Sequence, residues 1–416
     1  MSPLLPRPPP RPPPAASGED LSEEEGLDRA VMKAGDEFDS LGFVEPDHGD
    51  SLGESMKSYR EWFQAKAERR LKRLEARQEK LPQPGDWASL PKATLKALLR
   101  KGLSPEHRPE VWWSCLGCEA QRQRSPVAYQ QYLQEKLELS TAETIERDLT
   151  RTFPNHRKFR SAAGRGELRN VLHAFARRWP SVQYCQGLNF IAGLLLVVLR
   201  DEERAFWALV CAFDALGVEG YYTEGMTLLR ADMSVLSIFM KTRCSKVAKE
   251  LQRLNIDLLS ICSEWYLTWF AKSLPIATVL RVWDTLFFEG FKILFRVAMG
   301  VFKKVEQEVL QCGSFDGVME RAKRWPRDMV EHNELLKISF GGYTPFRRKD
   351  LLKARDEALV RIEREDEEHR REVQARREAS KARAAASSAA PPPAPPTMDS
   401  SPLRVEDRAR KDDAGL

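Results

Sequence analysis

The chain has 416 residues, of which 42% are apolar and 31% are charged, and its formal net charge is +5 at pH 7. This length suits one large domain with tails or two modest domains, with a packed core in part of the chain. The small net charge gives no indication of a nucleic-acid partner, and seven cysteines without the spacing of a disulfide-bonded domain indicate a reducing compartment.

Residues 1–55 are predicted to form a disordered N-terminal region. The stretch 3–14 holds eight prolines and two arginines among its twelve residues, which favours a polyproline II helix of the kind that SH3-type domains bind. A plain disordered tail explains the same composition, so both interpretations stay open. Residues 19–50 carry twelve acidic and two basic side chains, a balance typical of disorder. Within them "FDSLGFV", 38–44, is an apolar island suited to docking on the main domain.

Residues 56–87 are predicted to form a basic helix and a linker. The stretch 57–80 holds nine basic and four acidic residues with good helix propensity. We expect a solvated helix that leads into the domain, and a peripheral contact with acidic membrane lipid is the alternative. Its aromatic residues, Tyr59, Trp62 and Phe63, lie together near its start and are not interleaved with the basic residues along the stretch, so no nucleic acid is expected as a partner.

Residues 88–340 have the composition of a packed domain. Apolar residues recur there at the helical period in eleven segments. These segments are 92–100, 127–137, 167–178, 188–199, 203–215, 227–240, 246–254, 264–273, 275–288, 294–310 and 315–324. No stretch has the two-residue period of a strand, so the fold class is predicted to be all-α. The most apolar run, 190–199, falls well short of the roughly twenty residues of a membrane span and is predicted to be a buried core helix.

The stretch "IERDLTRTFPNHRKFR", 145–160, places an acid and a base on one side of a helix. At the helical period, Ile145, Asp148 and Arg151 fall within about 120° of one another, so that Ile145 can anchor this side in the core. Asp148 can then pair with Arg151. Because Pro154 stops the helix, Arg151 is predicted near the helix end, where its side chain can leave the surface. A structural arginine bonded to the terminal carbonyls and an arginine aimed at an external partner both remain open here.

The stretch "SVQYCQGLNFIAG", 181–193, begins as irregular backbone before an apolar helix. Gln186 lies in this irregular part, and its amide both donates and accepts, so it can orient a water molecule. A loop glutamine bonded to the backbone is the alternative. Tyr184 is expected to be a core aromatic residue under either interpretation. No base is predicted beside Cys185, which is therefore interpreted as a packing residue rather than a nucleophile.

Residues 341–386 are predicted to form a charged, exposed helix. Acidic and basic residues alternate there at helical spacing with few apolar residues, and no strict heptad supports a coiled coil. Residues 387–416 are predicted to be a disordered tail.

The region from about 102 to 325 resembles the TBC domain, the GTPase-activating domain for Rab-type small GTPases. "KGLSPEHRPEVW" carries the opening motif, "IERDLTRTFPNH" the I-x-x-D-x-x-R motif, and "YCQGLNFIAG" the Y-x-Q motif. "WYLTWFAKSLPIATVLRVWDTLFFEG" resembles a later shared block. The residues in register are Arg108, Trp112, Ile145, Asp148, Arg151, Tyr184, Gln186, Pro275, Arg281, Trp283 and Asp284.

The resemblance implies a GTPase-activating protein for a Rab-family small GTPase in its GTP form, with Arg151 and Gln186 supplied in trans as catalytic fingers. It implies orienting or structural support from Asp148, Ile145, Tyr184, Arg108, Trp112 and Asp284. GTP and Mg²⁺ would be carried by the partner, so neither a cofactor, a metal nor stand-alone enzyme activity is expected of this chain. We expect a cytoplasmic protein recruited peripherally to endomembranes in vesicle trafficking. The alternative is a non-catalytic Rab-binding effector or scaffold whose proline-rich tail recruits SH3 domains.

Other sites are predicted to be absent. Cys115 and Cys118 lack a second Cys or His pair nearby, so no zinc site is expected. His156 and His173 are interpreted as structural. No Walker-type glycine loop is present, so the chain is not expected to bind nucleotide by itself.

Overall fold

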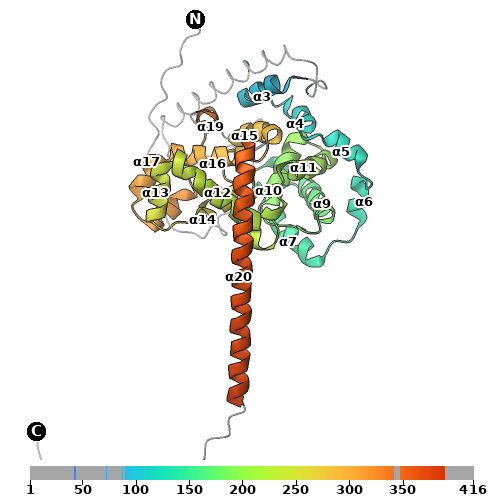
Figure 1. Ribbon diagram of the computed structural model, residues 1–416. Coiled ribbons are helices and arrows are strands. Elements are labelled where there is room, and N and C mark those ends of the chain that lie inside the picture. The colour runs from blue at the N-terminus through green and yellow to red at the C-terminus, as the bar shows by residue number, and fades with distance from the viewer. Residues whose placement is uncertain (1–41, 44–71, 73–86, 88–89, 342–346, 389–416) are drawn as a thin grey trace, which may run out of the picture. The chain divides into compact units, whose positions relative to one another are not determined.

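The protein is helical throughout the part that the computed structural model describes (Figure 1). The described residues are 42–43, 72, 87, 90–341 and 347–388. They contain eighteen α-helices and two 3-10 helices, and no strand among them beyond an isolated bridge between Phe43 and His156. The predicted all-α fold class is confirmed. None of the helices in these ranges is both long and apolar enough to span a membrane.

Four predicted elements lie wholly or mostly outside the described residues. They are the proline-rich stretch 3–14, the acidic stretch 19–50 apart from Gly42 and Phe43, the basic stretch 57–80 apart from Lys72, and the tail 387–416 apart from its first two residues. The predictions made for them therefore stay predictions.

The helices follow one another with short connections. The first eight are α3 (Lys92–Lys101), α4 (Arg108–Leu116), α5 (Cys118–Arg124), α6 (Tyr129–Gln134), α7 (Leu139–Leu149), α8 (Arg157–Arg160), α9 (Ala162–Arg178) and α10 (Leu188–Leu199). Next come α11 (Glu202–Leu216), η2 (Glu219–Tyr221), η3 (Glu224–Met226), α12 (Thr227–Arg243), α13 (Ser245–Arg253) and α14 (Leu258–Leu267). The last are α15 (Ile276–Glu289), α16 (Lys292–Lys304), α17 (Glu306–Cys312), α18 (Phe315–Ala322), α19 (His332–Phe340) and α20 (Arg348–Ser388). Every predicted helical segment overlaps at least one of these helices.

Helix α10 lies in the core because all its residues except Asn189 are apolar or glycine. Eleven of its twelve residues are buried. It contacts α9 and α11 most extensively, and α4 and α7 less. Figure 1 shows how α9, α10 and α11 are grouped. The predicted buried helix at 190–199 is confirmed.

One predicted segment, 264–273, is helical only at its start. Helix α14 ends at Leu267, and Trp269 and Phe270 have positive φ angles of 47° and 67°. The Leu267 carbonyl accepts a hydrogen bond from the Tyr222 hydroxyl at 2.9 Å instead of continuing the helix. Trp269 and Phe270 are fully buried. Tertiary packing therefore ends the helix earlier than the period of apolar residues predicts.

Helix α20 begins inside the main compact unit, which extends to Ile362. Arg355 is buried there and donates to the Asp232 carboxylate of α12 at 2.7 and 2.6 Å. The charged helix predicted at 341–386 is present from Arg348 onward, and one side of its first turns is buried in the packed domain through Leu351, Arg355, Ala358 and Ile362.

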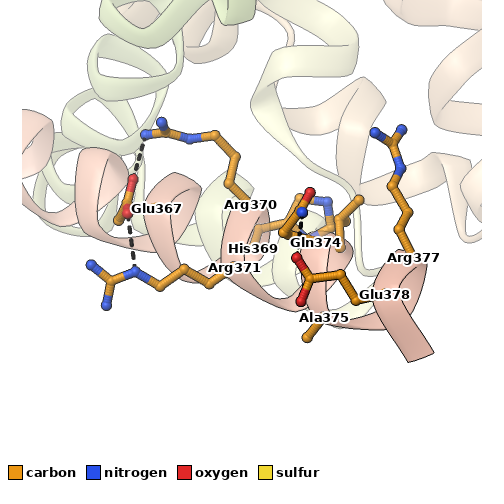
Figure 2. A pocket seen from close by; sticks show the side chains of 9 residues that line it. Glu367, His369, Arg370, Arg371, Gln374, Ala375, Arg377 and Glu378 are labelled. Carbon is orange, nitrogen blue, oxygen red and sulfur yellow. Dashed lines mark hydrogen bonds and ion pairs between the residues drawn. The ribbon is translucent and has the colours of Figure 1, made fainter. Parts of the chain in front are cut away.

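The second compact unit begins at Glu363, and its described part is the remainder of α20. Figure 2 shows Glu367 paired with Arg370 and Arg371 at 3.0 Å each. Gln374 donates to Glu378 at 2.6 Å. These spacings of three and four residues support an exposed helix. The hollow drawn in Figure 2 is lined by residues of α20 alone, so it is a groove along one helix rather than an enclosed cavity.

Candidate functional site

The arginine turn, residues 150–154, follows directly after α7. Because α7 ends at Leu149, Arg151 lies just past the helix rather than on its last turn. The Thr152 hydroxyl donates to the Asp148 carbonyl at 2.6 Å and so satisfies one of the last carbonyls of the helix. The helix therefore ends two residues before Arg151, the residue whose side chain is predicted to leave the surface.

The Asp148 carboxylate connects the arginine turn to a second stretch of the chain. It is 2% exposed, and its Oδ1 pairs with Arg151 at 2.5 Å. Its Oδ2 accepts a hydrogen bond from the Tyr184 hydroxyl, also at 2.5 Å. Ile145, on the same side of α7, is fully buried. The carboxylate thus pairs with one nitrogen of the Arg151 guanidinium, while the Arg151 side chain remains 45% exposed.

The Tyr184 phenol is a permanent donor to this carboxylate. Burial raises the pKa of Tyr184, and the hydrogen bond to Asp148 raises it further. The phenol therefore stays protonated at neutral pH. The residue pattern alone predicts a core aromatic residue at Tyr184, and the resemblance adds a supporting role; the structure shows Tyr184 as a polar partner of Asp148.

The glutamine loop, residues 180–187, leads into α10. Gly187 has a φ of +114°, and a Cβ atom there would lie 3.0 Å from the Leu267 carbonyl oxygen, so this close approach requires glycine. Gln186 precedes it and is exposed. Its side chain makes no hydrogen bond within the ranges that the structure describes. The amide is therefore available to donate to, and accept from, a partner.

Asn189 links the arginine turn to the glutamine loop, a role that is not among those predicted from the sequence. It is fully buried, its Nδ2 donates to the Thr152 hydroxyl at 2.7 Å, and its Oδ1 accepts from the Gly187 N–H at 3.0 Å. Thr152 adjoins Arg151, and Gly187 adjoins Gln186. Each hydrogen bond therefore ends one residue from a predicted finger. The signal that identifies Asn189 is a polar residue within an otherwise apolar helix.

Gly193 lets the arginine turn lie directly against α10. A Cβ atom at this position would come within 3.1 Å of the Thr152 methyl group and 3.2 Å of the Phe153 ring. A larger side chain would push the turn away from the helix. Helix α10 therefore positions the arginine turn in two ways. Asn189 bonds the Thr152 hydroxyl, and Gly193 lets the turn pack closely against the helix.

The remaining predicted support residues form a separate cluster around Asp284 of α15. This carboxylate is buried and accepts from Arg108 Nε at 2.8 Å and from Trp112 Nε1 at 3.1 Å. The Arg281 guanidinium and the Leu103 N–H also donate to it, at 3.3 and 3.2 Å. These bonds join α4 and the segment before it to α15, so the cluster stabilises the domain.

The other reactive side chains are in packed surroundings. Burial, assisted by the charge of Asp148, raises the pKa of the Cys185 thiol. Burial raises the pKa of Cys115 to about 12, and Cys118 is buried as a free thiol. His156 is buried and accepts a backbone N–H bond at 3.1 Å. Within the described ranges, no group of three His, Cys, Asp or Glu side chains is placed to hold a metal ion.

The site presents two different polar groups to solvent. Arg151 offers a cationic planar fork that matches two phosphate oxygens. Gln186 offers an amide that can accept from a water molecule while it donates to an oxygen. Both are supplied by stretches that Asp148 and Asn189 tie together.

Comparison with known proteins identifies one domain family. The Rab-GTPase-TBC domain model matches residues 105–310. The chain is 36% identical to growth hormone-regulated TBC protein 1 of Homo sapiens over 234 residues, which are 56% of this chain and 69% of that protein. It is 35% identical to TBC1 domain family member 2A of Homo sapiens over 287 residues. That match covers 67% of this chain but only 31% of the relative, so the chain spans less than a third of that protein's length.

Two solved structures share the fold. The Chlamydomonas flagellar RabGAP TBC domain matches with a TM-score of 0.61 and 30% sequence identity, over 73% of this chain and all of that one. The Ypt/Rab-GAP domain of Gyp1p matches with a TM-score of 0.54 and 19% identity, over 65% of this chain and 97% of that one.

Proposed function

The chain belongs to the Rab-GTPase-TBC domain family, and from this premise we propose that it is a GTPase-activating protein for a Rab-family small GTPase. Its substrate is the partner in the GTP-bound form, with GTP and Mg²⁺ held by the partner. This chain adds catalytic side chains in trans and needs no nucleotide or metal of its own. Its setting is the cytoplasmic surface of endomembranes, where it ends the active state of a GTPase in vesicle trafficking.

We assign the role of arginine finger to Arg151. A slow GTPase lacks positive charge on the phosphoryl group that is transferred, and an arginine inserted by a partner supplies it. Arg151 suits this role because it is 45% exposed and yet held by the buried Asp148. The ion pair restricts the side chain before the partner arrives, so less freedom is lost in the complex.

We assign the second finger to Gln186. Hydrolysis also needs a water molecule placed in line with the bond that breaks. A neutral amide can accept a hydrogen bond from this water and donate to a phosphate oxygen at the same time. The exposed Gln186 side chain, without a partner in the described part of the chain, is available for this task.

The observation that best supports the proposal is the double use of the Asp148 carboxylate. It binds Arg151 and also Tyr184, which stands two residues before Gln186 in the chain. Asn189 adds a second link between the same two stretches. A bridge between two stretches that each carry a solvent-facing polar group is expected of a composite catalytic site and is not needed for a packed core alone.

A turnover assay tests the proposal. The purified full-length chain is mixed with each member of a panel of GTP-loaded Rab GTPases, and phosphate release is followed under single-turnover conditions. We expect at least one Rab to hydrolyse GTP about 10³–10⁵ times faster than alone. Binding that depends on GTP but leaves hydrolysis unchanged for every Rab would instead identify a non-catalytic effector or scaffold.

A further inference from the structure

A short piece of the N-terminal region contacts the domain beside the arginine turn. Phe43 forms an isolated antiparallel bridge with His156, and the Arg157 N–H donates to the Gly42 carbonyl at 2.9 Å. Phe43 lies 62 residues before residue 105, where the match to the family begins. The apolar island that the sequence predicts to dock on the domain is therefore in contact with it at these two residues.

Gly42 fits this position because it has no side chain. Its φ is +90°, which strains any residue with a Cβ atom. A Cβ atom there would also lie 2.9 Å from Arg157 Nε and 3.0 Å from His156 Nε2. The contact is therefore specific in shape and does not depend on apolar character alone.

Phe43 completes an aromatic cluster behind the arginine turn. Its ring meets Phe153 edge to face at 5.6 Å and His156 at 4.6 Å. Phe153 in turn contacts Phe190 of α10 at 5.4 Å and Phe159 of α8 at 6.2 Å. Aromatic rings at these separations attract one another beyond the effect of burial. Phe43 thus adds packing to the residues that hold the turn.

Phe153 determines how the chain leaves the arginine turn. Its φ of +44° is unusual for an aromatic residue, and such a conformation persists only where the surroundings hold it. Phe153 follows Arg151 by two residues, and its carbonyl accepts from the His156 N–H at 2.8 Å. Removing Phe43 takes a packing partner from both Phe153 and His156. The turn then has fewer contacts that keep Arg151 beside Asp148.

We propose that the segment Gly42–Phe43 is a positioning element for Arg151, so that a part of the chain outside the span matched by the family model contributes to GTPase activation. The inference rests on the proposed function of Arg151. The segment acts through Phe153 and His156 on the conformation of the turn. It therefore affects the rate of hydrolysis within the complex and not the affinity for the GTPase.

Amide hydrogen exchange tests the docking without a GTPase. In the full-length protein, Phe43→Ala and Gly42→Val are expected to speed exchange of the Arg157 amide, which donates to the Gly42 carbonyl, by about tenfold or more. The matched control Phe315→Ala removes an exposed phenylalanine from α18 and leaves this amide unchanged. Unchanged exchange of the Arg157 amide in both segment variants overturns the proposal.

Single-turnover hydrolysis tests the positioning. Phe43→Ala is expected to lower the maximal rate about tenfold, because a small misplacement of a catalytic group is costly. The half-saturating concentration of the GTPase should not change, and Phe43→Leu should recover most of the rate. In an Arg151→Ala background, Phe43→Ala should add no further loss, since it acts through Arg151.

Three results would overturn the positioning role. A faster rate in Phe43→Ala would make the segment inhibitory. An unchanged rate together with faster exchange would make the docking irrelevant to catalysis. If the wild-type protein accelerates no Rab, the proposed function fails, and this role fails with it even where exchange shows docking. In the second case the wild-type protein still accelerates a Rab, so only the positioning role fails and the proposed function stands.

Discussion

Replacing Asp148 with asparagine separates the orientation of Arg151 from its charge. In the native protein one carboxylate oxygen serves Arg151 and the other serves the Tyr184 hydroxyl, each at 2.5 Å. The asparagine keeps the shape, but its nitrogen cannot accept a hydrogen bond, and the counter-charge of Arg151 is lost. Because the native side chain is only 2% exposed, water cannot replace the missing acceptor without rearrangement.

The expected loss follows from the exposure of the two partners. A hydrogen bond to a charged group contributes about 1.5–3 kcal/mol. Arg151 is 45% exposed, so solvent screening favours the lower end. A loss of about 1.4 kcal/mol corresponds to a tenfold change in rate. We therefore expect Asp148→Asn to lower the maximal single-turnover rate about tenfold while the affinity for the GTP-bound partner is kept.

A double-mutant cycle measured by phosphate release completes this test. In an Arg151→Ala background, Asp148→Asn should cause no further loss, since its effect passes through Arg151. An equal loss in both backgrounds would mean that Asp148 supports the fold and does not orient Arg151. No loss in the otherwise native protein would refute the orienting role.

Three further results are expected. Asp284→Ala leaves two buried arginines without their carboxylate and should lower the free energy of unfolding, measured by urea titration, by about 3–5 kcal/mol. A loss under about 1 kcal/mol would contradict the stabilising role of the cluster around Asp284. Although burial raises the pKa of Glu289, its ion pairs with Arg100 and Lys292 lower it overall, from 4.5 to about 2. The linked stability, on the order of 3 kcal/mol, should be present above pH 4.5 and be lost as the pH falls towards 2. A difference in the free energy of unfolding between the wild type and Glu289→Gln that does not change with pH would argue against it. Since burial raises the pKa of Cys185, iodoacetamide should label this thiol at pH 8 more slowly than a cysteine in an unstructured peptide, and faster labelling would exclude that environment.

Features set by local chemistry were predictable from the sequence. Residues 188–199 are apolar apart from Asn189, which favours a buried helix, and α10 has these bounds. The spacing of three residues predicts the pairing of Asp148 with Arg151, which forms. The sequence does not show that α7 stops at Leu149. The hydroxyl of Thr152 that bonds the helix end is itself held by an amide 37 residues away.

Features that depend on distant partners were not predictable in the same way. The stretch 38–44 is visibly apolar, but no local pattern identifies the surface that Phe43 meets, because Phe153 and His156 follow more than a hundred residues later. The end of α14 likewise depends on buried aromatic packing and on a hydroxyl donor to Leu267 from outside the helix. The spacing of apolar residues predicts which side chains are buried, but not which distant residues they contact.

The single-turnover rate of GTP hydrolysis by a responsive Rab in the presence of Arg151→Ala tests the proposed mechanism most directly. The predicted result is a fall of about 10³–10⁵ towards the intrinsic rate of the GTPase, with GTP-dependent binding retained. A rate equal to that with the wild-type protein would contradict the assignment of Arg151 as the group that stabilises the transferred phosphoryl.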